Sequence, residues 1–280
     1  MPPLARRVVA LYWMAGASAL LMLAILAFFP VQSDDLFMYL AIGRRMVRDG
    51  ALPVIDPFLF SIPNYQWHVA QEWGSYLTAY GLYSLGGWTL LIAVKTLLLV
   101  GTAGIALATA WRLRVRSAIV PLLVLLAAIA GYHRFIERAS LVSDVLTATV
   151  LAIVAIDRAT PGRLRYALPV IFLAWVNLHP GFYIGLAICG LSVLWDIGRI
   201  RERPVQGFAA CVIASAIICL INPDGVAGVT YPLRPIFDRS WDIYRTYNYE
   251  WMPTLEPGYL QSVHVLSLIH ISEPTRRRGI

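Results

Sequence analysis

The chain has 280 residues, of which 59% are hydrophobic and only 14% are charged, and its mean hydropathy is +0.66. A soluble globular domain of this length does not need so much apolar surface, so the composition excludes that class and predicts a polytopic membrane protein. The net charge of +7 comes almost wholly from arginines that cluster between apolar segments. Such clusters indicate how the chain is oriented in a membrane rather than binding to a nucleic acid.

The first apolar segment covers residues 8–29 and follows Arg6 and Arg7. At about 1.5 Å per residue it is long enough to cross roughly 30 Å of hydrocarbon. Its length, and the lack of a convincing small-residue cleavage site before Pro30, favour an uncleaved anchor over a cleaved signal peptide. The basic residues before the segment predict a cytoplasmic amino terminus, so the chain after Pro30 is expected outside the cytoplasm.

The chain is organised around residues 33–50, with the sequence SDDLFMYLAIGRRMVRDG. Ser33 is a suitable N-cap and Gly50 a suitable stop, so a helix of about four turns is predicted between them. One face should carry the charged side chains and the other should be apolar, with Leu36, Tyr39, Leu40, Gly43, Met46 and Val47. An amphipathic helix of this kind is expected to lie along a membrane surface, with the acidic pair Asp34 and Asp35 on the outer side.

The predicted outer loop covers residues 30–87. Prolines at 53, 57 and 63 interrupt any helix there, and a second surface helix is expected over residues 69–85. Gly86 and Gly87 then lead into a span over residues 88–111, which ends at arginines interpreted as cytoplasmic.

Later apolar segments complete a prediction of about seven spans. Single spans are expected over residues 117–132, 141–156 and 205–221, and residues 166–195 are broken by Asn177-Leu178-His179-Pro180-Gly181. Arginines flank both ends of that broken segment, which favours a hairpin of two short arms over one long helix. Because backbone that turns within a membrane must be shielded or face water, Asn177 and His179 are expected to line the floor of a cavity open to the outer side.

The order of these features resembles the C-type (GT-C) membrane glycosyltransferases, which use polyprenyl-phosphate-linked sugars. The motifs SDDLFMYLAIGRRMVRDG, DPF, QEW, WVNLHPGF, INPDG and YEW follow one another as in a bacterial branch of that superfamily, between residues 8 and about 251. The resemblance implies an all-α transmembrane domain, of which residues 1–265 are the N-terminal part. It also implies an aspartate of the first outer loop acting on the acceptor, an inverting transfer of a hexosyl group, and a lipid-phosphate donor.

Asp34 or Asp35 is the candidate catalytic base, because an acceptor hydroxyl must lose a proton as it attacks the anomeric carbon. The alternative is that both acids only stabilise the positive end of a helix, by about 0.3–1 kcal/mol. Arg134 and Arg138 are candidates for the lipid phosphate, since the guanidinium fork suits phosphate oxygens. Alternatively, Arg138 pairs with Glu137 or Asp144, or extends to lipid headgroups.

The remaining candidates are polar or aromatic residues that could bind the sugar or the donor: Asp56, Glu72, Trp73, Lys95, Asn177, His179, Glu250 and Trp251. Acids beside aromatic residues suit sugar stacking and hydroxyl binding, although tryptophan is also ordinary at a membrane interface. His179 and Asn177 either bind a ligand or satisfy the broken turn. Lys95 is an ionisable residue within a span, which either has a function or extends to the nearby outer interface.

No cofactor is expected. His68 and Glu72 are one helical turn apart, but no second histidine at ligand spacing supports a divalent metal site. The three cysteines, Cys189, Cys211 and Cys219, lie inside apolar runs and are expected as buried small residues rather than disulfide partners or metal ligands.

The end of the sequence has a different character. Residues 266–276, LSLIHISEPTR, look like the translation of a transposase adapter used in sequencing libraries. Residues 266–280 are therefore expected to be a non-native tail on an N-terminal fragment.

These observations predict a multi-pass glycosyltransferase of the bacterial inner membrane, acting on its outer face. Its expected partners are the polyprenyl-phosphate-linked sugar, membrane lipids and an acceptor that is a glycan, a lipid or a protein, with no nucleic acid. Two alternatives stay open: a transporter or flippase of a lipid-linked glycan, and a non-catalytic membrane scaffold.

Overall fold

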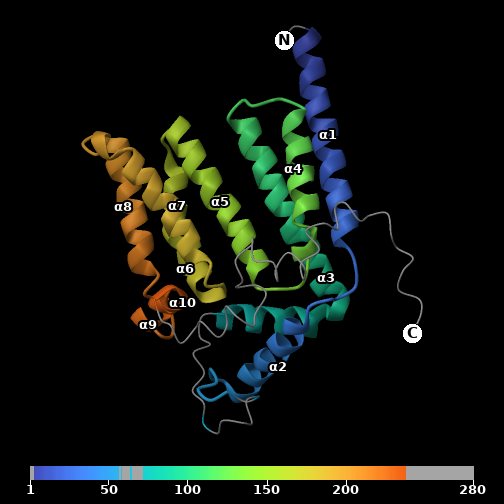
Figure 1. The fold of residues 1–280 in the computed structure, drawn as a ribbon, viewed down its shortest axis with the longest axis vertical. Coiled ribbons are helices and arrows are strands. Elements are labelled where there is room, and N and C mark those ends of the chain that lie inside the picture. Colours follow the sequence, from blue (N-terminus) through green and yellow to red (C-terminus); the bar gives the residue numbers. More distant parts are fainter. Residues whose placement is uncertain (1–2, 57, 59–63, 65–71, 238–280) are drawn as a thin grey trace. The chain divides into compact units, whose positions relative to one another are not determined.

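A computed structural model describes residues 3–56, 58, 64 and 72–237, and the regular elements in this part are all helices (Figure 1). They are α1 (Pro3–Ala27), α2 (Asp34–Asp49), α3 (Trp73–Arg112), α4 (Ile119–Ala130), α5 (Ser140–Ala159), α6 (Leu168–Leu178), α7 (Phe182–Trp195), α8 (Arg203–Ile218), α9 (Val226–Thr230) and α10 (Arg234–Phe237). Short 3-10 helices are η2 (Tyr132–Arg134), η3 (Arg163–Ala167), η4 (Ile197–Arg199) and η5 (Tyr231–Leu233). The chain divides into a large unit, Met1–Val229, and a small unit from Thr230 that contains η5 and α10. The candidate site residues that the structure describes all lie in the large unit.

Three helices are long and apolar enough to cross a membrane: Arg6–Ala27 in α1, Trp73–Arg112 and Ser140–Ala159. Three shorter apolar helices, α4, α7 and α8, have 12, 14 and 16 residues. At about 1.5 Å per residue they reach only about 18–24 Å, short of a hydrocarbon core of about 30 Å. The all-helical class and the membrane character are thus supported, whereas seven spans stay a prediction.

Helix α2 begins and ends where the sequence indicates. Ser33 is extended at its start, and Gly50 adopts a left-handed conformation (φ 65°) whose amide donates to the Met46 carbonyl. The Ser33 hydroxyl makes no capping hydrogen bond, so only the backbone part of the predicted cap is present. Glycine suits the C-terminal position because a Cβ would be strained at positive φ.

The buried face of α2 differs from the predicted apolar face at three positions, Leu40, Ile42 and Val47. The buried residues are Leu36, Tyr39, Ile42, Gly43 and Met46. Ile42 is 0% exposed although the predicted apolar face did not include it, whereas Val47, which belongs to that face, is 60% exposed. Helix α3 covers a stripe at spacings of three and four residues that ends at Met46, and the next residue points about 100° away from it.

The contact between α2 and α3 is close because Gly43 lacks a side chain. A Cβ at Gly43 would collide with the Tyr76 carbonyl oxygen and would lie 2.6 Å from the Tyr80 Cβ. Figure 1 shows α2 and the first part of α3 lying across the ends of the longer helices. Glycine therefore lets the amphipathic helix sit directly on the start of α3.

Helix α3 consists of two helical pieces. Gly86 (φ −148°, ψ 16°) and Gly87 (φ 59°, ψ −152°) leave the helical conformation, which confirms the predicted break. The piece before the break packs on α2, and α3 as a whole also contacts α1, α4 and α5. The break thus redirects the chain from the α2 layer into the main group of helices.

The hairpin of α6 and α7 is also confirmed, with the break between Leu178 and Phe182. Its arms pack tightly: a Cβ at Gly185 would lie 2.5 Å from the Trp175 ring, and Phe172 and Trp175 are fully buried. The three cysteines are buried and free, as expected, in the cluster around this hairpin.

Candidate functional site

An ion pair joins the first turn of α2 to the link before α5. Arg138 Nη2 lies 2.9 Å from Asp35 Oδ2, and the two side chains are 32% and 43% exposed. The pair is therefore held by the fold but open to solvent or ligand. Asp34, the first residue of α2, is exposed, and within the described residues no hydrogen bond or ion pair connects it to this cluster.

Glu72, at the start of α3, lies beside this pair and is surrounded by donors. The Tyr39 and Tyr76 hydroxyls donate to Glu72 Oε2 at 3.1 and 3.4 Å, and His179 Nε2 lies 3.6 Å from Oε1. Burial raises the pKa of Glu72, and the tyrosine hydrogen bonds and the Arg138 charge oppose that shift. Glu72 is thus an acid in a confined, hydrogen-bonded site.

The hydrogen bonds of His179 define its tautomer. The Gly181 amide donates to Nδ1 at 3.0 Å, so Nδ1 carries no proton. The Ser143 hydroxyl, 2.7 Å away, also donates to Nδ1 and itself accepts from the Trp175 indole N–H at 2.7 Å. The proton of the neutral ring is therefore on Nε2, the nitrogen that faces Glu72.

Electrostatics keep this imidazole neutral. Burial, then the charges of Arg138 and Arg134, lower the pKa of His179 to about 4. The contact with Glu72 is consequently a long neutral contact rather than an ion pair at neutral pH.

Acidification from pH 7 toward pH 4 is expected to destabilise the native state through His179. The unfolded ring takes up a proton near its ordinary pKa of 6.5, whereas the native ring stays neutral down to about 4. The difference is on the order of 2–3 kcal/mol near pH 4.5 and vanishes above pH 7. Wild-type Tm should therefore fall more steeply over this range than the Tm of His179→Gln.

Glu72 contributes to the pH dependence of stability with the opposite sign, because its raised pKa stabilises the native state as the pH falls. Glu72 is present in both wild type and His179→Gln, so it does not cause a difference between their Tm profiles. Parallel Tm profiles for the two proteins would contradict the neutral, Nε2-protonated assignment.

Trp73 and Asn177 fix the turn of the hairpin against the start of α3. The Trp73 indole N–H donates to Asn177 Oδ1 at 2.8 Å, and Asn177 Nδ2 donates to the Leu173 and Ile221 carbonyls at 2.9 Å each. The Ser75 hydroxyl donates to the Leu178 carbonyl at 2.6 Å. Of the two roles considered for Asn177, these bonds favour the satisfied turn, and its place at the floor of a cavity stays a prediction.

An apolar cavity of about 110 Å³ adjoins the cluster between α2, α3 and α5. Most of its wall is aliphatic, including Leu36, Ala79, Leu82, Leu91 and Leu141. Tyr39, Lys95, Glu137 and Arg138 add polar atoms to its lining. Arg138 therefore belongs both to the apolar cavity and to the pair with Asp35.

Lys95 does not extend to an interface but forms a buried ion pair. Its Nζ lies 2.7 Å from Glu137 Oε1, with side-chain exposures of 1% and 5%. The same ammonium group donates to the Phe29 carbonyl at 3.3 Å and sits 3.5 Å above the Phe29 ring. The Gln32 amide donates to Glu137 Oε2 at 3.2 Å. Lys95 thus connects the segment after α1 to the link that carries Arg138. Glu137, a predicted partner of Arg138, is paired with Lys95.

The other predicted residues lie around or outside the cluster. Arg134 ends η2 and acts on His179 through its charge. Asp56 accepts a hydrogen bond from the Phe58 amide at 2.7 Å. His68, Glu250 and Trp251 lie outside the described residues.

Sequence reasoning missed Tyr39 and Ser143 as members of the site. Tyr39 lies one helical turn after Asp35 on the same helix, a spacing that could have linked it to the acidic pair. Ser143 had no signal, because serines near the start of an apolar helix are ordinary.

Two chemical capacities meet in this site: a carboxylate that can accept a proton and a guanidinium that can bind phosphate oxygens. Within the described part of the chain, no group of three or more His, Cys, Asp and Glu side chains is placed to hold a metal ion. No family model, curated protein or solved structure matches the chain.

Proposed function

We propose that the chain is a membrane glycosyltransferase that transfers a sugar, with inversion, from a polyprenyl-phosphate donor to an envelope acceptor on the outer face of the bacterial inner membrane. The observation that carries this proposal is the double role of Arg138, which lines the apolar cavity and pairs with Asp35 at 2.9 Å. In the proposed topology the amino terminus is cytoplasmic, the chain makes seven spans, and α2 lies on the outer surface.

The donor is proposed to bind with the phosphate end of its isoprenoid chain in the apolar cavity. The aliphatic wall shields this part of the isoprenoid from water, and the guanidinium of Arg138 binds the phosphate oxygens. The cavity lining contains two cationic residues, Lys95 and Arg138. Because the charge of the buried Lys95 is neutralised by Glu137, Arg138 is proposed as the residue that binds the phosphate.

Once the phosphate engages Arg138, the Asp35 carboxylate is freed to act as the base. It accepts the proton of the acceptor hydroxyl as that oxygen forms a bond to the anomeric carbon. The bond from the anomeric carbon to the phosphate oxygen breaks at the same time, and polyprenyl phosphate leaves with its charge stabilised by Arg138. Glu72, already surrounded by Tyr39, Tyr76 and His179, is proposed to hold the geometry of the site.

A flippase for a lipid-linked glycan is the second candidate. The buried Lys95–Glu137 pair beside an apolar cavity favours it, because ionisable residues within membrane segments often mark transport pathways. A flippase would move the donor without breaking its sugar–phosphate bond, so release of polyprenyl phosphate separates the two functions.

Filling the cavity tests the donor site. Thr78 is exposed and lines the cavity, so Thr78→Trp in the full-length protein is expected to raise the KM for the polyprenyl donor about tenfold or more. Ser84, also exposed on α3 and bonded to the carbonyl four residues earlier like Thr78, lies outside the lining and provides the control Ser84→Trp. The assay is release of polyprenyl phosphate in membranes. Equal KM values for both variants and wild type would reject the donor site.

A further inference from the structure

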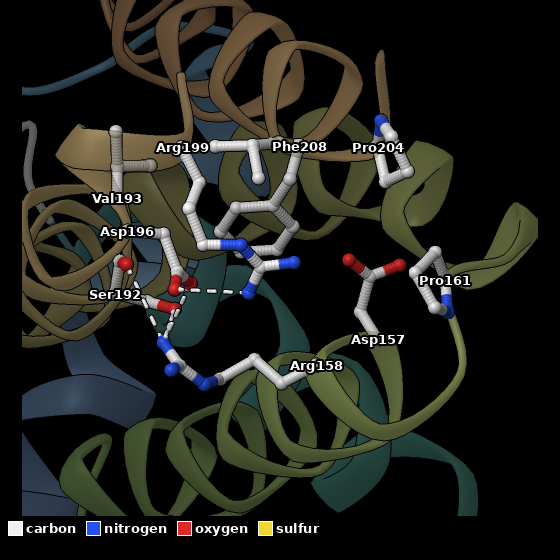
Figure 2. Close-up of a pocket in the computed structure, with 10 residues that line it drawn as sticks. Asp157, Arg158, Pro161, Ser192, Val193, Asp196, Arg199, Pro204 and Phe208 are labelled. Atoms are coloured by element: carbon white, nitrogen blue, oxygen red, sulfur yellow. Dashed lines mark hydrogen bonds and ion pairs between the residues drawn. The ribbon is translucent and has the colours of Figure 1, made fainter. Parts of the chain in front are cut away.

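A second cavity, of about 90 Å³, lies at the other end of α5 from the Asp35–Arg138 cluster (Figure 2). Ser143, next to His179, and Asp157, in the second cavity, are 14 residues apart on α5, which is about 21 Å along a helix. The second cavity is therefore separate from the site described above.

Asp196 joins two arginines at this cavity. Arg158 Nη1 lies 2.9 Å from Asp196 Oδ2 and donates to Ser192 Oγ at 3.2 Å, and Arg199 Nη1 lies 3.8 Å from Asp196 Oδ1. Arg199 Nε and Nη2 donate hydrogen bonds to Glu202 Oε1 and Oε2, at 2.9 and 2.8 Å. The hydrogen bonds that Arg158 donates to described residues all come from Nη1, so its Nε and Nη2 groups can donate to a ligand.

Asp157 has one engaged and one available oxygen. Its Oδ1 accepts hydrogen bonds from Arg165 Nε at 2.9 Å and from the Gly162 amide at 3.2 Å, and Arg165 Nη2 lies 2.8 Å from it in an ion pair. Arg165 is in turn held by the Gly162 and Pro204 carbonyls. Oδ2 accepts no hydrogen bond from the described residues, and Figure 2 shows the carboxylate directed into the cavity. A buried acceptor thus faces the same space as Arg158.

The charges around the cavity balance. Three arginines and three acids surround it: Arg158, Arg165, Arg199, Asp157, Asp196 and Glu202. A simple anion would meet two lining carboxylates, and a simple cation would meet two lining arginines, so neither fits well. A group with one phosphate and one primary ammonium matches both kinds of side chain.

The depth of the cavity in the fold indicates a lipid. It lies where the apolar helices α5 and α7 end and arginines begin, which is the level of headgroups at a membrane interface. Val193 and Phe208 provide an apolar side to its lining. We propose that this cavity binds the headgroup of a phosphoethanolamine phospholipid, with the phosphate on Arg158 and the ammonium on Asp157 Oδ2.

Binding of short-chain phosphatidylethanolamine to the full chain in detergent, measured by native mass spectrometry, tests this site. Phosphatidylcholine is the matched ligand, because it has the same phosphate and net charge but its ammonium has no N–H donor. Phosphatidylglycerol reports a purely anionic preference. We expect phosphatidylethanolamine to bind about tenfold more tightly than either of the other two lipids.

Arg158→Gln is expected to weaken phosphatidylethanolamine binding about tenfold. Arg163→Gln removes the same charge from an exposed position at the same end that does not line the cavity, and it should bind as wild type does. Asp157→Asn should lower the affinity for phosphatidylethanolamine to the level for phosphatidylcholine. If that variant fails to fold because Arg165 loses its partner, the wild-type lipid preference and the two arginine variants decide. Equal binding of phosphatidylethanolamine and phosphatidylcholine, tighter binding of phosphatidylglycerol, or equal losses in both arginine variants would overturn the proposal.

Discussion

Replacing Lys95 alone with methionine is expected to lower the free energy of unfolding by about 3–5 kcal/mol, because Glu137 would be left buried without its partner. Glu137 is 5% exposed in its side chain, so water cannot replace the lost ammonium group. The Phe29 carbonyl would also lose a donor, which loosens the segment after α1.

The double variant Lys95→Met/Glu137→Gln should recover most of that loss, since neither buried charge remains. Leu97→Met provides the control on the same helix, at a position that is 68% exposed and away from the pair. Unfolding followed in detergent for wild type, Lys95→Met, Glu137→Gln and the double variant measures the coupling between Lys95 and Glu137. A single variant as stable as the control would mean that the pair is not buried as described.

Replacing Arg138 with glutamine is expected to lower kcat for sugar transfer by about 10²–10³-fold, because the charge on the leaving phosphate would lose its stabilising cation. The effect on stability should be small, on the order of 1 kcal/mol or less, since the pair with Asp35 is partly exposed. Arg138→Lys should recover only part of the activity, because an ammonium group cannot bind two phosphate oxygens as the guanidinium fork does.

Arg45→Gln is the matched control for Arg138. Arg45 pairs with Asp49 at 3.3 Å on the exposed side of α2, so the variant removes an arginine from an ion pair without touching the cavity. The measurement is steady-state release of polyprenyl phosphate together with Tm. Equal activity of Arg138→Gln and Arg45→Gln would remove Arg138 from the proposed mechanism.

The boundaries of the helices were predictable because local chemistry sets them. Gly50, the Gly86-Gly87 pair and the Asn177–Gly181 break each interrupt a helix for reasons that lie within a few residues of the chain. The buried face of α2 was predicted less well. A helical wheel identifies an apolar side, but the position of α3 decides that Ile42 is covered and Val47 is not.

The partners within the site could not be predicted, because they come from distant parts of the chain. Asp35 meets Arg138, Glu72 meets His179, and Lys95 meets Glu137 only when α2, α3 and the link before α5 are packed together. The sequence indicated that Asp35, Glu72, Arg138 and His179 were chemically capable, yet it could not assign them to one cluster. The sequence also could not show whether the Asn177 side chain is hydrogen-bonded within the protein or available to a ligand, because its partner, the Trp73 indole, lies far away in the sequence.

The most direct test of the central claim compares Asp35→Asn with Asp34→Asn in the full-length protein, with transfer from a polyprenyl-phosphate sugar as the readout. Asp35 pairs with Arg138, whereas Asp34 is exposed one residue earlier, so the two variants differ only in which carboxylate is lost. We predict a loss of about 10²–10⁴-fold for Asp35→Asn and near wild-type transfer for Asp34→Asn. Full transfer by Asp35→Asn at normal expression would contradict the proposed site.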